Sequence, residues 1–128
     1  MDYVPVAEVR VMVPAAEIRV VDGDTIRLGR ERIRIIGLDA PESGNLARCD
    51  AERKLSALAT MTLRETIEGK FIEIRRDGHD RYGRTLAYVN IRGGGSVAEL
   101  MIRQRLAVRF GNGRPDWCSG LAERALRR

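Results

Sequence analysis

Apolar and polar residues alternate with a period of two in three short stretches of the chain, residues 18–20, 26–28 and 33–35. Such alternation is typical of β-strands that have one buried face. A Gly-Arg pair at residues 29–30 lies between the second and third stretches and is a candidate turn. The pattern therefore predicts a meander of three strands.

A helical period replaces this alternation after residue 50. We expect Asp50 to be the N-cap of a helix and Gly69 to end it, because these residue types are typical of the two positions. Between them, side chains that recur every three or four residues would form one buried face: Ala51, Leu55, Leu58, Ala59, Thr62, Leu63 and Ile67.

The remainder of the chain contains further strand and helix signals. Residues 70–76 and 84–91 resemble strands, and the polar residues 77–83 between them resemble a loop. The sequence Ser-Val-Ala-Glu at 96–99 matches a capping box and predicts a second helix. We also expect residues 119–128 to form a short basic helix.

Three strands, a helix, two strands and a helix follow one another in the order of an OB-fold. We therefore predict a mainly β fold with α-helices (α+β), a five-stranded OB-fold barrel with two to three helices. A chain of 128 residues is most simply one domain. Residues 15–128 would form it. Residues 1–14 would be an N-terminal extension or an extra strand, restricted to an edge by Pro5 and Pro14.

Composition and charge narrow the choice of partner. The chain has 23 basic and 18 acidic residues, a net charge of +5, and its largest apolar run is too short to span a membrane. A basic protein of this kind often binds an anionic partner such as nucleic acid, although many small basic proteins bind no polyanion. The N-terminal residues lack the apolar core of a signal peptide, so the sequence leaves the compartment unknown.

Several charged residues interrupt the predicted strands. Asp24 and Asp39 supply hard oxygen atoms, which Ca²⁺ and Mg²⁺ prefer as ligands. Arg34 and Arg84 have the planar guanidinium group that binds two phosphate oxygens at once. Glu42 lies three residues after Asp39 and is a spare carboxylate. A metal, arginines and a carboxylate together suit the attack of water on a phosphodiester.

Each of these features also has an ordinary structural explanation. The Asp-Gly-Asp sequence at 22–24 is a common hairpin turn, and the sequence at 39–42 resembles the start of a helix. Arg34 is equally compatible with a surface ion pair, and Tyr-Gly-Arg at 82–84 with a turn. The presence of all of them in one chain favours a site.

Three segments, VVDGDTIRL, RIRIIGLDAPE and DRYGRTLAYV, resemble the staphylococcal nuclease (thermonuclease) family, which has an OB-fold. The similarity extends from about residue 17 to about residue 110, and the sequence AELMIRQRLA is similar to the next helix of that family.

This resemblance implies a role for each matching residue. Asp24 and Asp39 would bind Ca²⁺ through their carboxylates and Ala40 through its backbone carbonyl, and Asp22 would orient water around the metal. Glu42 would orient or deprotonate the attacking water. The remaining positions would bind phosphate: Arg34 and Arg84 the scissile group, and Arg81 and Tyr82 its neighbour.

Three side chains depart from the family pattern or lack a clear role. Phe110 occupies a region where the family often has a base-stacking tyrosine; we expect it in the core, with base stacking as the alternative. His79 is expected to face solvent, and Trp117 to pack the C-terminal segment against the domain.

The two cysteines, Cys49 and Cys118, do not form a zinc motif with the single histidine. Two free thiols is the simpler prediction. A disulfide becomes possible if the C-terminal segment folds back over the first helix.

The resemblance implies a monomeric, calcium-dependent nuclease, expected to be an endonuclease, that hydrolyses DNA and RNA and binds no membrane. It also favours a secreted or periplasmic location. The alternative is a non-catalytic OB module that binds nucleic acid or protein. A nuclease that uses Mg²⁺ or Mn²⁺ is a further possibility.

Overall fold

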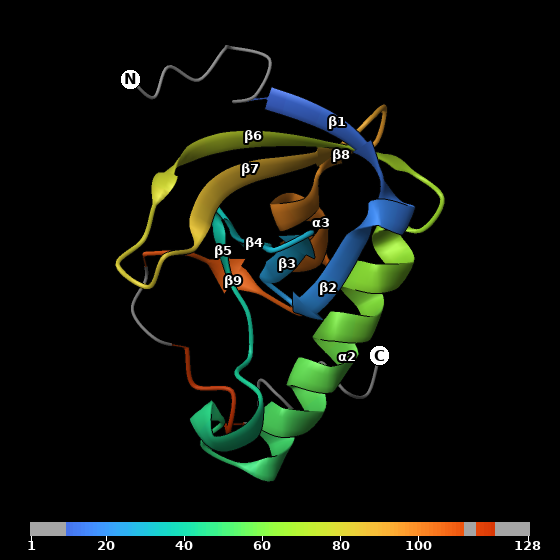
Figure 1. The fold of residues 1–128 in the computed structure, drawn as a ribbon. Helices are drawn as coiled ribbons and strands as arrows, with labels where there is room; N and C mark the ends of the chain where they lie inside the picture. The colour runs from blue at the N-terminus through green and yellow to red at the C-terminus, as the bar shows by residue number, and fades with distance from the viewer. Residues whose placement is uncertain (1–9, 112–114, 120–128) are drawn as a thin grey trace.

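The computed structural model describes residues 10–111 and 115–119 (Figure 1). Within this part of the chain one sheet has seven strands and a second, small sheet has two. Two short 3-10 helices, η1 (Ala15–Glu17) and η2 (Gly44–Leu46), lie in the connections. The strands of the large sheet are β1 (Arg10–Pro14), β2 (Ile18–Asp22), β3 (Thr25–Leu28), β4 (Glu31–Ile35), β6 (Phe71–His79), β7 (Thr85–Ile91) and β8 (Gly95–Ser96).

The order of the main strands across the large sheet is β1-β6-β7-β4-β3-β2, and β8 pairs with β7. All neighbours are antiparallel except β4 and β7, which are parallel. The two edge strands, β1 and β2, are consecutive in the chain and are joined by η1. The sheet therefore curls so that its edges approach each other (Figure 1).

Two α-helices cover openings of the curled sheet. Helix α2 (Asp50–Ile67) packs along β2, and α3 (Val97–Arg103) packs against β7 and β5 (Figure 1). The small sheet pairs β5 (Leu38–Asp39) with β9 (Val108–Arg109), so the chain that follows α3 returns to the end of the meander.

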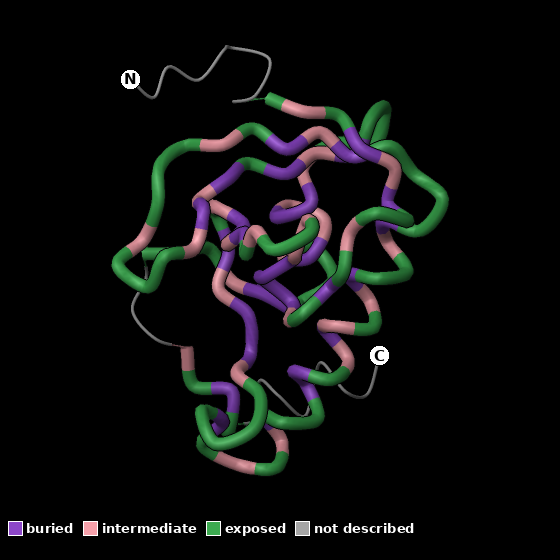
Figure 2. The backbone as a smooth tube through the Cα atoms, viewed as in Figure 1, coloured by how far each residue is buried: buried purple, intermediate pink, exposed green. Residues whose placement is uncertain are grey.

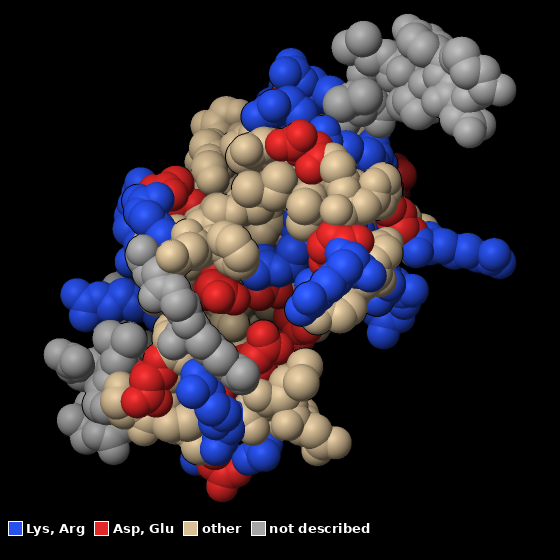
Figure 3. Space-filling model, turned by 90° about the vertical axis from the view of Figure 1, so that its left-hand side faces the viewer, with Lys and Arg blue, Asp and Glu red and all other residues tan. Residues whose placement is uncertain are grey.

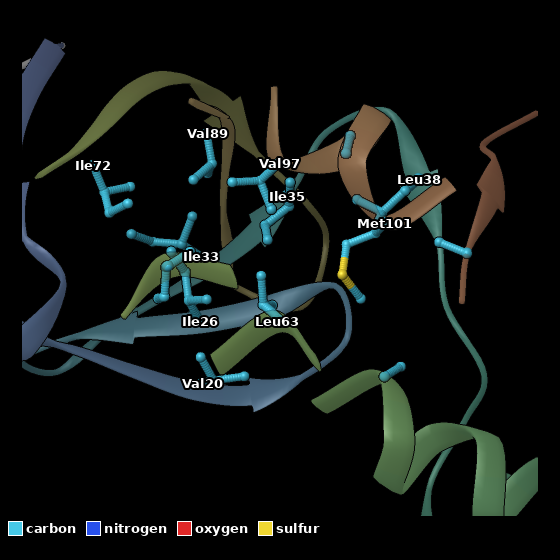
Figure 4. Packing of buried hydrophobic residues seen from close by; sticks show 14 of the residues in the cluster. Val20, Ile26, Ile33, Ile35, Leu38, Leu63, Ile72, Val89, Val97 and Met101 are labelled. Atoms are coloured by element: carbon cyan, nitrogen blue, oxygen red, sulfur yellow. The ribbon is translucent and has the colours of Figure 1, made fainter. Parts of the chain in front are cut away.

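A single hydrophobic core fills the space between sheet and helices. Alternate residues of the strands face inward, as the burial pattern of β7 shows, and Figure 2 places the buried residues where the elements face one another. Ile33, Leu63 and Ile72 are fully buried at the centre (Figure 4). This burial supplies most of the stabilising free energy of the fold.

The predicted fold class is confirmed: the molecule is an α+β, OB-fold-like domain with a curled sheet and two helices in its described part. The three-strand meander is β2–β4, and the clearest predicted helix is α2. Trp117 is buried, as expected of a packing anchor, and His79 is exposed at the end of β6.

Three local predictions are wrong. The N-cap of α2 is Cys49, whose sulfur accepts a hydrogen bond from the Glu52 N–H, and Asp50 is already helical. Strand β6 continues to His79, because a register irregularity after Arg76 lets His79 pair with Thr85. Phe110 is 68% exposed and is therefore not part of the core.

Some predictions fall on residues that the structure does not describe. Residues 1–9 of the predicted N-terminal extension lie outside the described residues, as does nearly all of the basic helix predicted over 119–128. Residues 10–14 form β1, which pairs with β6. No helix in the described part of the chain is long and apolar enough to cross a membrane.

Replacement of Leu63 by alanine should lower the free energy of unfolding by about 2–5 kcal/mol, because it leaves a cavity between α2 and the sheet. Met61 lies on the same helix and is 49% exposed. Met61→Ala should therefore change stability by less than about 0.5 kcal/mol. Guanidinium denaturation of both variants measures the difference, and equal losses would contradict this description of the core.

Candidate active site

Arg34 is the central charged residue of the candidate site. Its guanidinium Nη2 lies 3.6 Å from Oδ2 of Asp24 and 3.4 Å from Oδ1 of Asp39. Its Nη1 donates to the backbone carbonyls of Ile35 and Leu38, both at 3.0 Å. The side chain is only 13% exposed. These contacts fix the guanidinium and bring the two carboxylates to a single nitrogen atom.

The backbone explains why these residues meet. Thr25 of β3 is paired with Arg34 of β4, so the preceding Asp24 lies beside the end of β4. The Ile35 N–H donates to the Asp24 carbonyl at 2.9 Å, which extends this pairing into the turn. Asp39 returns to the same place because β5 begins three residues after β4 ends.

The donor chemistry of Asp24 and Asp39 suits a divalent cation such as Ca²⁺. Calcium takes oxygen ligands at 2.3–2.6 Å, so two oxygens that share an ion lie within roughly 5 Å of each other. Both carboxylates already approach one atom of Arg34, and the Ala40 N–H donates to Asp24 Oδ2 at 3.3 Å. Ala40 is thus close enough to contribute its backbone.

Side chains alone do not complete such a site. Among the described residues, no group of three or more His, Cys, Asp or Glu side chains is arranged to hold a metal. An ion held by these two carboxylates would need backbone carbonyl and water as its further ligands, as calcium sites permit.

Asp22 adds a third negative charge at the edge of this cluster. Burial and the nearby charge of Asp24 raise the pKa of the Asp22 carboxyl, while a hydrogen bond from Ser43 and the charge of Arg84 oppose the increase. Carboxylates that repel one another in this way favour the binding of a cation.

Gly23 separates the two aspartates because α2 packs directly on the turn. A Cβ atom at this position would lie 2.8 Å from Cβ of Ala59 and 3.0 Å from Cβ of Ala40. The Asp-Gly-Asp sequence therefore forms the hairpin turn between β2 and β3, which is the structural alternative given for it above. The same turn also carries the carboxylates of the site.

Arg84 is oriented by its own loop. Its Nε donates to Oδ2 of Asp80 at 2.7 Å, and Oδ1 of Asp80 accepts from the backbone N–H groups of Tyr82 and Arg84, both at 2.9 Å. The exposed Tyr82 ring lies 5.1 Å from the guanidinium carbon of Arg81 and 5.7 Å from that of Arg84. The loop therefore holds Arg84 before β7 begins.

A pocket of about 810 Å³ joins several predicted residues from different elements. The hollow in Figure 3 shows acidic side chains next to basic ones on this face of the molecule. Arg34 and Arg81 do not line the pocket themselves. Each contacts a residue that does: Arg34 pairs with Asp39, and Arg81 lies over the ring of Tyr82. The predicted residues in the lining are Asp39, Ala40, Glu42, Tyr82, Arg84 and Phe110.

Glu52 was not anticipated from the sequence and holds the segment that carries Glu42. Its side chain is fully buried, and its two carboxylate oxygens accept from the backbone N–H groups of Glu42 and Arg48, each at 2.9 Å. Glu52 lies three residues after the N-cap Cys49, the position of the glutamate in a capping box. This spacing could have indicated that Glu52 caps the helix. It could not have indicated that Glu52 also binds the backbone of Glu42.

The C-terminal segment forms another wall of the pocket. A disulfide joins Cys49 to Cys118. The simpler prediction of two free thiols is therefore wrong, and the alternative of a disulfide is correct. Arg48 also donates from Nη2 to the Pro115 carbonyl at 2.7 Å. The buried Trp117 next to the disulfide lines the pocket. This wall is thus fastened to the beginning of α2.

Comparison with known proteins gives consistent similarities. A family model described as staphylococcal nuclease homologue matches residues 32–117. A thermonuclease from Staphylococcus intermedius is 37% identical over 76 residues, which cover 56% of this chain and 45% of the relative. A micrococcal nuclease from Shigella flexneri is 38% identical over 76 residues, covering 56% and 39%. The chain spans less than half the length of these relatives, and the family match begins after Asp24.

Replacement of Glu52 by glutamine should destabilise the protein, because the amide cannot accept from both backbone N–H groups and one remains unpaired in a buried position. The expected loss is about 1–3 kcal/mol of unfolding free energy. Glu65→Gln, at an exposed position of the same helix, should change it by less than about 0.5 kcal/mol. Denaturation measures both, and hydrogen exchange at the Glu42 amide should quicken only in the Glu52 variant. An unchanged exchange rate would refute the positioning role.

Proposed function

The chain belongs to the staphylococcal nuclease homologue family, and from this we propose that it is a calcium-dependent nuclease that hydrolyses phosphodiester bonds of DNA and RNA. The observation that carries the proposal is the convergence of Asp24 and Asp39 on Arg34, beside a pocket that Glu42 and Arg84 line. The two curated relatives carry the names thermonuclease and micrococcal nuclease, which supports this class of reaction.

The carboxylates of Asp24 and Asp39 and the carbonyl of Ala40 would hold Ca²⁺, and Asp22 would orient water around it. When bound, the ion supplies Lewis-acid stabilisation of charge on the phosphate oxygens. Burial, and after it the negative charge of Asp24, raises the pKa of the Asp22 carboxyl. A cation beside these carboxylates would offset the repulsion between them.

Arg34 and Arg84 would bind the scissile phosphate and stabilise the charge that develops on it. Each is held by fixed acceptors, Arg34 by two carbonyls and Arg84 by Asp80. A donor that is already oriented stabilises a transition state without further reorganisation, which is the largest contribution in many such reactions.

Glu42 would orient or deprotonate the attacking water. Its backbone is fixed by Glu52, and Glu42 lines the same pocket as Arg84. Arg81 and Tyr82 would contact the neighbouring phosphate. Phe110, exposed in the pocket lining, would provide a surface on which a base stacks.

We further propose that the protein acts as a monomeric endonuclease in an oxidising compartment such as the periplasm or the cell exterior. One chain supplies every residue of the candidate site. The Cys49–Cys118 disulfide is typical of proteins from such compartments.

Cleavage of denatured DNA should require Ca²⁺ and cease when a chelator is added, because the ion would supply the Lewis-acid stabilisation of the phosphate. The assay follows acid-soluble nucleotides with Ca²⁺, Mg²⁺, Mn²⁺ or chelator. Cleavage with Mg²⁺ or Mn²⁺ but not Ca²⁺ would assign another metal. DNA binding without cleavage under any condition would replace the proposal with a non-catalytic binding module.

Alanine at Arg34, Arg84 or Glu42 should each lower kcat by roughly 10²–10³-fold, the usual effect of removing one preorganised group. Arg92→Ala is the matched control, because Arg92 is exposed in the turn before β8 and lines neither the pocket nor its surroundings. Single-turnover cleavage of one oligonucleotide measures all four variants. Full activity in the three site variants would exclude the mechanism.

A further inference from the structure

Three arginines lie directly opposite one another on neighbouring strands. Arg19 of β2 is paired with Arg27 of β3, and Arg27 is paired with Arg32 of β4. Residues that are paired in this way point to the same face of a sheet. We call Arg19, Arg27 and Arg32 the arginine ladder. Neighbouring strands are roughly 5 Å apart, so the ladder extends about 10 Å across the sheet.

The arginine ladder forms no ion pair within the described residues. Directly opposed like charges destabilise a sheet. None of the three arginines forms an ion pair with another described residue, and Arg32 donates only to the neutral carbonyl of Tyr82, at 2.6 Å. The Nε atom of Arg27 is buried and finds no hydrogen-bond partner in that part of the structure. Within the described residues, no ion pair therefore competes with an external anion for these three guanidinium groups.

The ladder is continuous with the candidate active site. Arg32 and Arg34 are two residues apart on β4 and so share one face of the sheet. Arg32 and Arg84 line the pocket and also a second, larger groove of about 1200 Å³, which Arg19 and Arg27 line as well. A chain bound in the pocket thus has a basic path along which to leave it.

The residues that line this groove carry a net positive charge, which favours the binding of a polyanion. Beyond the ladder it reaches the end of α2, where Arg64 and Lys70 line it. Three acidic residues also line the groove, against six basic ones. The acidic residues are Asp22, three residues after Arg19 on β2, and Glu65 and Glu68 at the end of α2.

We propose that the arginine ladder is a second phosphate-binding surface, which holds the backbone of a polynucleotide two or three nucleotides away from the cleaved bond. This inference rests on the proposed function. Guanidinium groups bind phosphate through paired hydrogen bonds, and each contact releases counterions and so adds salt-dependent affinity. At 3.4 Å of axial rise per nucleotide in a duplex strand, the span of the ladder covers about three nucleotide steps. The ladder would thus make affinity depend on the length of the substrate.

The test measures binding without cleavage. The variant Arg19→Gln/Arg27→Gln and the control Arg75→Gln/Arg92→Gln lose the same charge, but neither control residue lines the pocket or the groove. Fluorescence anisotropy in chelator follows binding of a 30-nucleotide single strand and of a trinucleotide over a range of salt concentrations. Thermal unfolding checks that both variants fold, and relief of repulsion should leave the ladder variant at least as stable as the wild type.

For the long strand, loss of two phosphate contacts should lower the slope of log K against log salt by about 1.4, or 0.7 per contact. Its Kd should rise on the order of tenfold at low salt. The trinucleotide should bind the ladder variant and the control alike, because it is too short to reach both the pocket and the ladder. The control should retain the wild-type slope.

Equal slopes and affinities of the ladder variant and the control would overturn the inference, even if the wild type cleaves DNA. So would a wild type that binds no DNA. Conversely, a ladder-dependent slope in a protein that never cleaves would keep the inference and reject the proposed function.

Discussion

The site depends on how one largely buried arginine is neutralised. Burying the Arg34 guanidinium would be unfavourable without partners. Two carboxylates and two backbone carbonyls satisfy it, and they belong to the β2–β3 turn, the end of β4 and β5. These contacts tie three segments together at one end of the sheet. The same contacts that stabilise this end of the barrel thereby place the acidic cluster beside the pocket.

The beginning of α2 imposes the second constraint. Gly23 allows α2 to touch the turn between the aspartates, and Glu52 fixes the backbone of Glu42. The disulfide of Cys49 brings the C-terminal segment, with Trp117, to the same place. Helix α2 therefore positions groups from three other parts of the sequence: the turn at Gly23, the segment at Glu42 and the C-terminal segment. A shift of α2 would alter the carboxylate cluster and the pocket wall together.

The periodicity of apolar residues was sufficient to predict the meander and α2, because each is stabilised by a repeated local pattern that burial requires. The segments around Asp24, Arg34 and Arg84 were predictable as charged interruptions of that pattern. The role of Glu52, by contrast, depends on two backbone N–H groups, one of which is ten residues away. The exposure of Phe110 depends on the return of the chain to β5. Such long-range effects leave no local period to recognise.

The net charge of +5 conceals a separation of charge that comes from strand register. Register places the carboxylates around Arg34 at the end of the sheet and opposes Arg19, Arg27 and Arg32 farther along the same face. A shift of one residue in β3 would move Arg27 to the core face and bring Ile26 into water. The hydrophobic core thus enforces the alignment of like charges despite their repulsion. A phosphate backbone that lies on this face would relieve the repulsion between the arginines. A cation at the end of the sheet would do the same for the aspartates. The same strand register thus forms a surface for anions and a site for a cation.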